Sequence, residues 1–346
     1  MKRNAWIVSA VMMVAGTAYA GPPAITKEPV LDTVQVLSWP RDVQPTGPDL
    51  TNPTSNMLED LHGTLGHCDL MFSSEGNYNM ALKELWAKYI AAYPDDGANR
   101  MYTTSPPVSP GQVTQGSLQI GNYRMLCRPQ VAVGNKSVMD KLRAANAFDG
   151  EPTPLYAVQG SVILVKKGNP KHIQTVWDLG RQGIRLVTPN PKLEPGAFNR
   201  YAGTIYNVAA NDPHPPQGMS ADKLYNTLFN GQSGDPMKWL CGVRIHHRDE
   251  PWSLAYGHAD AALIMYHLAK YTVDSFPDKF EMIPIGGSVD APKPLPGNAT
   301  GETFVVKIRG DWTDKQKQAA DHLYASLLSD DFTRILEKNG LMRATK

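Results

Sequence analysis

The fold of this chain is decided by the stretch Cys68-Asp-Leu-Met-Phe-Ser-Ser-Glu-Gly-Asn-Tyr-Asn-Met80. Its first half is a short apolar run, which predicts a buried strand over residues 68–73. Residues 74–77 form a polar turn, and apolar side chains then recur at helical spacing from Met80 to Ile90. A buried strand that passes through a turn into an amphipathic helix is the opening unit of an α/β fold.

The same alternation of strand and helix continues toward the C-terminus. It predicts mostly parallel sheets with helices on both faces, in which ligands bind beyond the carboxyl ends of the strands. Further strands are predicted at residues 100–104, 130–133, 155–167, 184–187, 243–247, 261–266, 280–285 and 304–307, and helices at 136–147, 194–201, 252–257 and within 314–339.

The first twenty residues have the pattern of a secretory signal peptide. Lys2 and Arg3 give a positive start, residues 5–14 are apolar, and Ala18-Tyr-Ala20 is a small-x-small cleavage site. The apolar run is short compared with the roughly 20 residues of a membrane span. We therefore expect residues 1–20 to be removed, and the protein to be exported to the periplasm without membrane insertion. An uncleaved anchor or a buried helix is the alternative.

Composition and charge are those of a soluble globular protein. The chain has 346 residues, with 42% hydrophobic and 19% charged side chains, which fits two lobes with ordinary cores. Without Lys2 and Arg3, the 34 basic residues fall to one fewer than the 33 acidic residues. No basic surplus points to nucleic acid or to an anionic membrane as a partner.

The three cysteines are Cys68, Cys127 and Cys241. An odd number leaves at least one thiol outside any intramolecular disulfide, and no C-x-x-C motif supports a redox role. A Cys68–Cys127 disulfide fits an oxidising compartment, and three separate buried thiols fit the sequence equally well.

Motifs of enzymes and metal sites are missing from the sequence. There is no G-x-S-x-G elbow, no P-loop and no G-x-G-x-x-G fingerprint, so we expect neither an enzyme nor a bound cofactor. A zinc site needs three or four converging ligands. His62, His67, His246 and His258 lack the spacing of such a site, and no metal is predicted.

Hydroxyl and amide side chains follow the first two predicted strands at their carboxyl ends. Neutral donors of this kind, together with backbone N–H groups at helix N-termini, bind small oxyanions. The same residue types also cap helices and form turns without any ligand, and both interpretations stay open. The candidate ligand-binding residues of this region are Ser73, Ser74, Asn77, Thr103, Thr104 and Ser105.

In the second half of the chain, Gly196 and Ala197 stand at the start of a predicted helix. Glycine lets the backbone approach a ligand closely, which makes both residues candidates for ligand contact. A Pro-Gly helix start without a ligand is the alternative. Glu194 just before would repel an anion unless it points to solvent.

His246 and His247 are neighbours at the end of a predicted strand, so at most one of them should face a ligand. We select His247, with Arg248 as a possible bidentate anion contact. For Arg248, a solvated ion pair is the alternative.

Five parts of the chain resemble type II periplasmic substrate-binding proteins, and most closely the molybdate- and sulfate-like branch of ABC transporter solute-binding proteins. These parts are residues 69–80, 160–170, 190–201, 246–262 and 327–336. The resemblance covers residues 68–346 and implies an α/β fold of two lobes. Each lobe would be a mostly parallel sheet flanked by helices, with the ligand cleft between them.

The resemblance also implies a division of the chain and a function. Residues 67–157 plus 270–346 would form the first lobe and 158–269 the second. Residues 21–66 lie outside the resemblance, and their many Pro, Thr and Asn residues predict an irregular arm laid over the first lobe. The lobes would close about residues 156–160 and 266–270. A monomer would capture a small ligand, such as an inorganic oxyanion, and deliver it to the permease of an ABC transporter.

The chain differs from well-known oxyanion binders in its N-terminal arm and in an aromatic, histidine-containing cleft rim. The alternative function is a periplasmic metal- or cofactor-binding accessory or sensor protein on the same fold, with a membrane sensor as partner.

Overall fold

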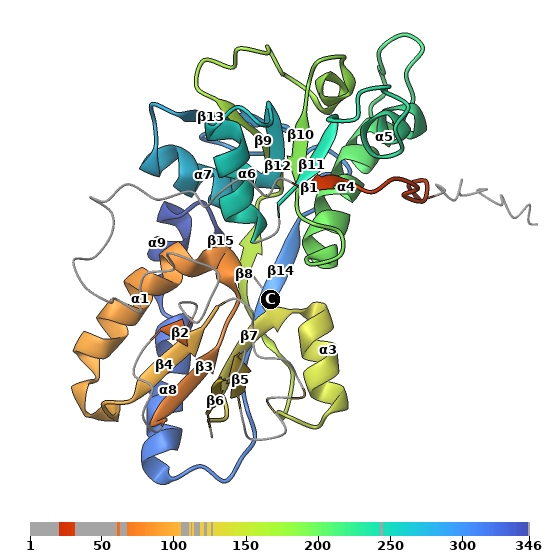
Figure 1. Ribbon diagram of the computed structural model, residues 1–346. Coiled ribbons are helices and arrows are strands. Elements are labelled where there is room, and N and C mark those ends of the chain that lie inside the picture. The colour runs from red at the N-terminus through yellow and green to blue at the C-terminus, as the bar shows by residue number, and fades with distance from the viewer. Residues whose placement is uncertain are drawn as a thin grey trace, which may run out of the picture.

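Two lobes, each built on one β-sheet, make up the protein (Figure 1). The computed structural model describes residues 21–31, 61–62, 68–104, 111, 113, 118–120, 123–125, 127–242 and 245–344. The mixed α/β architecture of two sheets flanked by helices confirms the predicted fold class. The expected signal peptide lies outside the described residues. In the part of the chain described here, no helix has the length and apolar character needed to span a membrane.

The first lobe contains a seven-stranded sheet in the order β15-β8-β14-β7-β3-β4-β2. β3, β4 and β7 run parallel, whereas β14 is antiparallel to β7 and β8. A small antiparallel pair, β5 and β6, lies in the same half of the molecule (Figure 1). The bounds of the strands are β2 Leu61–His62, β3 Leu70–Ser73, β4 Arg100–Thr103, β5 Leu118–Ile120, β6 Tyr123–Met125, β7 Val131–Asn135, β8 Thr153–Val158, β14 Gly301–Lys307 and β15 Met342–Arg343.

Helices cover both faces of this sheet, because side chains along its strands alternate between two apolar cores. On β3, Leu70 and Phe72 belong to the main core and Met71 to a second, smaller one. The helical segments of the lobe are η3 Gly76–Tyr78, α1 Asn79–Ala92, η4 Pro94–Asp96, α3 Lys136–Ala144, α8 Asp314–Leu327 and α9 Asp330–Lys338.

The second lobe contains a six-stranded sheet in the order β1-β11-β10-β12-β9-β13. Its core includes an aromatic cluster in which the rings of Phe198, Phe229 and Trp239 contact one another. The strands are β1 Val30–Leu31, β9 Ser161–Lys166, β10 Leu186–Thr188, β11 Trp239–Cys241, β12 Ala261–Met265 and β13 Phe280–Pro284, and the helical segments are η5 Val176–Gly180, α4 Pro195–Ala210, α5 Ala221–Phe229, α6 His246–Ala255 and α7 Tyr266–Ser275.

Among the described residues, two chain segments connect the lobes, and the side chain of Asn298 holds these two together. The first runs from β8 into β9 through Gly160, whose φ of +77° is a conformation that favours glycine. The second returns from β13 to β14. Asn298, on the second segment, accepts a hydrogen bond from the N–H of Ser161 at 2.8 Å and donates to the Ser161 carbonyl at 2.9 Å.

The second connection differs from the predicted one. Residues 270–346 were assigned to the first lobe, with a hinge at 266–270, but β13 pairs with β9 along its full length in the second sheet. The chain therefore returns to the first lobe only after β13. Local sequence does not reveal this, because the sheet that a strand joins depends on its long-range partner.

The N-terminal arm is described in two parts: β2 pairs with β4 in the first lobe, as expected, whereas the part around β1 lies elsewhere. β1 pairs in parallel with β11 at the edge of the second sheet, so this part of the arm packs on the second lobe and not on the first. Asn230, just after α5, accepts a hydrogen bond from the N–H of Thr26 at 2.7 Å and donates to the carbonyl of Ala24 at 3.0 Å.

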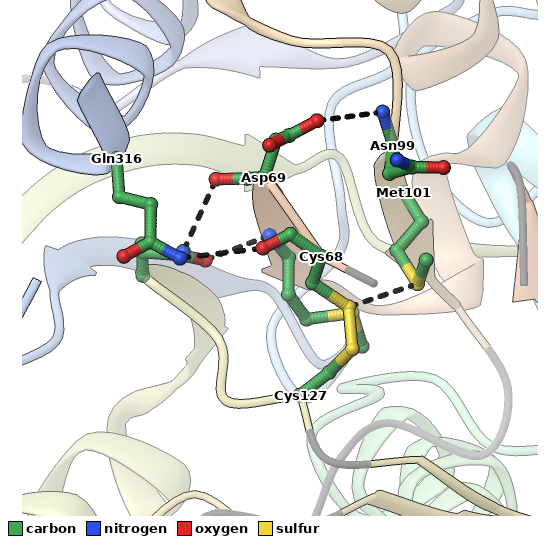
Figure 2. Close-up of a disulfide and its surroundings, with 8 residues drawn as sticks. Cys68, Asp69, Asn99, Met101, Cys127 and Gln316 are labelled. Atoms are coloured by element: carbon green, nitrogen blue, oxygen red, sulfur yellow. Dashed lines mark hydrogen bonds between the residues drawn. A yellow bond between two sulfur atoms is a disulfide. The ribbon is translucent and has the colours of Figure 1, made fainter. Parts of the chain in front are cut away.

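A disulfide joins Cys68 and Cys127 in the first lobe, with 5.8 Å between their Cα atoms (Figure 2). The Cys68 carbonyl accepts a hydrogen bond from Gln316 of α8 at 3.2 Å, and the sulfur of Met101 on β4 lies 3.6 Å from the Cys68 sulfur. Cys241 is a buried thiol outside the disulfide. Of the two arrangements open from the sequence, the structure has the disulfide.

Candidate functional site

A cavity of about 230 Å³ lies between the lobes, and both lobes and the connecting strands contribute to its walls. It is found beyond the carboxyl ends of β3 and β7, the place where the α/β pattern predicts a ligand. On its other side stand the N-terminal ends of α4 and α6 from the second lobe.

The first lobe supplies an acidic and amide wall made of Glu75, Asn77 and Asn135. One carboxylate oxygen of Glu75 accepts a hydrogen bond from the backbone N–H of Asn135 at 3.0 Å. The Asn135 side chain caps α3 by accepting from the N–H of Val138. Burial is the main cause that raises the pKa of Glu75 above its ordinary value.

The connecting strands supply hydroxyl groups at the back of the cavity. Tyr156 on β8 and Thr303 on β14 are buried, and the Tyr156 hydroxyl has no hydrogen-bond partner among the described residues. Burial first, and then the nearby charge of Glu75, raises the pKa of Tyr156 well above its ordinary value. Glu302, exposed on β14, adds a second carboxylate to the wall. A buried hydroxyl without a partner is costly, so this position favours a polar ligand.

The second lobe supplies a basic wall centred on Arg200 of α4. The side chain is partly buried, and its Nη1 donates to the carbonyl of Ala299 at 3.4 Å. Within the described ranges, no carboxylate lies close enough to Arg200 to form an ion pair with it. Gly196 and Ala197, one turn earlier on α4, line the same wall.

His246 completes this wall through a chain of hydrogen bonds. Glu194 accepts from the His246 backbone N–H at 2.9 Å, and its other oxygen lies 3.0 Å from Nδ1 of the ring. The second ring nitrogen, Nε2, lies 3.1 Å from the Tyr201 hydroxyl. Glu194 therefore occupies the N-terminus of α6 and fixes the His246 ring.

His267, in the first turn of α7, lies near Arg200 and the Asn77 backbone. It is fully buried, and neither ring nitrogen has a hydrogen-bond partner within the described part of the chain. Burial is the main cause that lowers the pKa of His267 to about 3, so the ring is neutral at physiological pH.

Of the residues selected from the sequence, Asn77, Gly196 and Ala197 line this cavity. Ser74 does not, because its hydroxyl is hydrogen-bonded to the Tyr78 hydroxyl inside the lobe and its N–H donates to the Thr103 carbonyl at 2.9 Å. Three other residues, Ser73, Thr103 and Thr104, are buried at the ends of β3 and β4 and are not part of the wall, and Ser105 lies outside the described residues.

The prediction for His247 and Arg248 depends on a strand that does not form. Residues 246–255 are the helix α6, and β11 ends at Cys241. His246 lines the cavity, whereas His247 and Arg248 do not. The strand alternation used to choose between the two histidines does not apply, because adjacent residues on a helix are not on opposite faces.

Several wall residues were missed in the sequence. Arg200 carried a usable signal, because it stands four residues after Gly196 on a predicted helix and so on the same face. Glu75 stands inside a turn already selected for its polar side chains. Tyr156, Glu302 and Thr303 carry no local signal, because only the pairing of β8 with β14 brings them together.

Metal ligands do not cluster in the structure as far as it is described. No group of three or more histidine, cysteine, aspartate or glutamate side chains there is arranged to hold an ion. His67, one of the residues considered, lies outside the described residues.

Comparison with known proteins shows a match between this chain and a protein family. Residues 70–342 match a family model described as bacterial extracellular solute-binding protein. Over 170 residues, or 49% of this chain, the sequence is 23% identical to the molybdate-binding protein ModA of Mycobacterium bovis and of Mycobacterium tuberculosis. The match spans 60% of the length of those relatives.

Among solved structures, the sulfate-binding protein SubI from Mycobacterium tuberculosis H37Rv is similar over 81% of this chain and 88% of its own. The TM-score is 0.52 at 15% sequence identity. This likeness shows a shared fold.

Proposed function

This chain belongs to the bacterial extracellular solute-binding proteins, and we propose that it captures a small solute with an anionic group in the cavity between its two lobes. Two kinds of observation support the proposal. The family is one of binding proteins, and the cavity has the polar walls and the position expected of a ligand site.

The observation that carries the proposal is the state of Arg200. A partly buried guanidinium faces the cavity without a carboxylate partner in the described structure. A charge withdrawn from water is stabilised only when it is paired, and guanidinium groups bind carboxylates and oxyanions through two parallel hydrogen bonds. An anionic group of the solute is the partner that Arg200 lacks.

The size of the cavity limits the solute. Sites for drug-sized ligands measure about 300 to 1,000 Å³. The cavity here, at about 230 Å³, is smaller, so the solute is a small ion or a small organic molecule.

Capture would draw the lobes together. A solute in this cavity contacts Glu75 or Asn77 from one lobe and Arg200 or His246 from the other. The solute would link the lobes through these contacts, which favours a closed arrangement about the connecting segments. We propose that the closed form delivers the solute to a membrane permease of the ABC type, after export of the protein to the periplasm.

The test is a binding titration with molybdate, tungstate, sulfate, phosphate and small carboxylates. Binding is measured by the heat released and by the change in melting temperature. A ligand at 100 times its dissociation constant should stabilise the protein by about 2.7 kcal/mol. Arg200→Gln should weaken the affinity for the anion at least about 100-fold, as expected for loss of a charged pair.

Arg334→Gln is the matched control, because Arg334 is an exposed arginine of α9 far from the cavity walls. If Arg200→Gln and Arg334→Gln both bind as the wild type does, anion capture by Arg200 is wrong.

A further inference from the structure

The cavity holds more negative than positive side chains. Glu75 and Glu302 line it together with Arg200, and Arg200 is the only lysine or arginine in its described walls. A bare oxyanion bound at Arg200 would therefore lie near two carboxylates, the partly buried Glu75 and the exposed Glu302. Like charges at short separation repel each other.

Of the helix N-termini at the cavity, those of α3 and α6 are already occupied by carboxylates of the chain itself, whereas that of α4 stands at Gly196 and Ala197. At α3, the N–H of Asn135 donates to Glu75, and at α6 the N–H of His246 donates to Glu194. Backbone N–H groups at helix N-termini are the usual donors for phosphate- and sulfate-like ligands. The N–H groups of Asn135 and His246 are therefore not available to a solute unless a carboxylate moves away.

Glu75 is well placed to bind a positive group. It projects from the turn after β3, on the lobe opposite Arg200, and only one of its oxygens accepts from a backbone N–H. Burial is the main cause that raises the pKa of Glu75, and the charge of Arg200 across the cavity already opposes this shift; a second cation beside Glu75 would oppose it further. The unpartnered hydroxyl of Tyr156 is near the same carboxylate.

Resting on the function proposed above, we infer that the solute is a small zwitterion, whose carboxylate pairs with Arg200 and whose ammonium group pairs with Glu75. One molecule would then satisfy a charge on each lobe at once. A fully deprotonated tetrahedral oxyanion could satisfy Arg200 alone.

The probes for this inference are three amino acids of increasing length and the carboxylates that lack only the amino group. Glycine is compared with acetate, β-alanine with propionate, and γ-aminobutyrate with butyrate, alongside sulfate and molybdate. Isothermal titration is carried out on the wild type, Glu75→Gln, Arg200→Gln and the control Glu151→Gln. Glu151 is an exposed residue on the surface of the first lobe.

We expect at least one amino acid to bind at least 100-fold more tightly than its matched carboxylate. Glu75→Gln should reduce that preference to below 10-fold, while Glu151→Gln leaves it unchanged. The glutamine can still accept from the Asn135 N–H, which favours an intact fold, and Glu302→Gln, at an exposed position, should lower the preference to a smaller extent.

Other outcomes separate this inference from the proposed function. Tight binding of sulfate or molybdate that is strengthened by Glu75→Gln would overturn the zwitterion and leave anion capture standing. A preferred amino acid whose affinity does not change in Glu75→Gln would also overturn it. Equal binding by Arg200→Gln and wild type would instead overturn the proposed function.

Discussion

The two lobes present opposite charges to one cavity, and they are stabilised by different means. The wall of the first lobe is built from Glu75, Asn77 and Asn135, and that of the second from Arg200 and His246. The first lobe is cross-linked by a disulfide, whereas the second is packed around an aromatic cluster.

The two lobes also differ in the hydrogen bonding of one buried carboxyl group in each. Asp96 in the first lobe is bonded to the Tyr89 hydroxyl at 2.8 Å and to the His322 ring at 2.9 Å. Glu250 in the second lobe is fully buried, and neither oxygen has a hydrogen-bond partner in the described structure. The comparison teaches that a buried carboxyl group is hydrogen-bonded in the first lobe, at Asp96, and without a partner in the described part of the second, at Glu250.

The largest expected effect is on the first lobe alone. Replacement of both Cys68 and Cys127 by serine opens a loop with a sequence separation of 59 residues. The chain-entropy model predicts a loss of about 4 kcal/mol in the free energy of unfolding. Calorimetry should show an earlier first transition with an unchanged second one. A uniform shift of a single transition would show that the lobes unfold together.

A smaller effect is expected at the connection between the lobes. In Gly160→Ala, the new Cβ would lie 2.9 Å from the Asn298 side chain, and the alanine would have to adopt a φ of +77°. We expect a loss of about 2 to 3 kcal/mol, from backbone strain and from displacement of Asn298. Gly168→Ala is the matched control, because Gly168 has the same φ with nothing within 4 Å of the Cβ position.

Gly168→Ala should lose only about 1 kcal/mol, the strain part of the effect. Urea denaturation of the two variants measures the difference. Equal losses would mean that the contact with Asn298 contributes nothing to stability.

The next effect concerns the carboxylate at the N-terminus of α6. Glu194→Gln keeps the shape of the side chain but removes its negative charge. In the wild type the two carboxylate oxygens are bonded to the backbone N–H and the ring of His246. We expect a loss of about 1 to 2 kcal/mol in stability. Sulfate should bind the variant more tightly, because one negative charge beside the cavity is gone. Weaker sulfate binding would show that Glu194 supports an anion through His246.

The smallest expected effect is a change in the pH dependence of stability. Burial raises the pKa of Glu250 well above its ordinary value of 4.5, so the folded protein holds this proton more tightly than the unfolded chain. The free energy of unfolding should therefore fall as the pH rises from about 4.5 through the raised pKa.

Glu250→Gln cannot titrate and should reduce this slope, with higher stability than the wild type at the upper end of the range. Urea denaturation at several pH values from 4 to 8 gives the slope. Identical slopes in the two proteins would mean that Glu250 is ionised and paired in the folded state.

The sequence predicted most of the individual elements, because their signals are local. The alternation of Leu70, Met71 and Phe72 between two cores is a property of one strand, and Pro195 marks the start of α4. The start of α6 was placed too late, because Pro251 favours the first turn of a helix and here stands inside one.

The site was predicted less well, for a physical reason. The hydroxyl of Ser74 is hydrogen-bonded to the Tyr78 hydroxyl inside the lobe and so is not available to a ligand. The pattern of hydroxyl residues in the sequence does not reveal this bond. Arg200 and Glu75 line the same cavity only because both lobes contribute to its walls. Their charges can act on one solute for that reason. Local sequence predicted where ligands bind in such a fold, but not which side chains lack partners there.

The two ends of the described chain are held by different lobes. Thr26 is bonded to Asn230 of the second lobe, and β15, which begins at Met342, pairs with β8 in the first. Two fluorophores, one near each end, would thus be attached to different lobes, and if the lobes close on a solute as proposed, energy transfer between the fluorophores would change. The chain is in this sense a ready optical reporter of its own solute, which needs no insertion into either lobe.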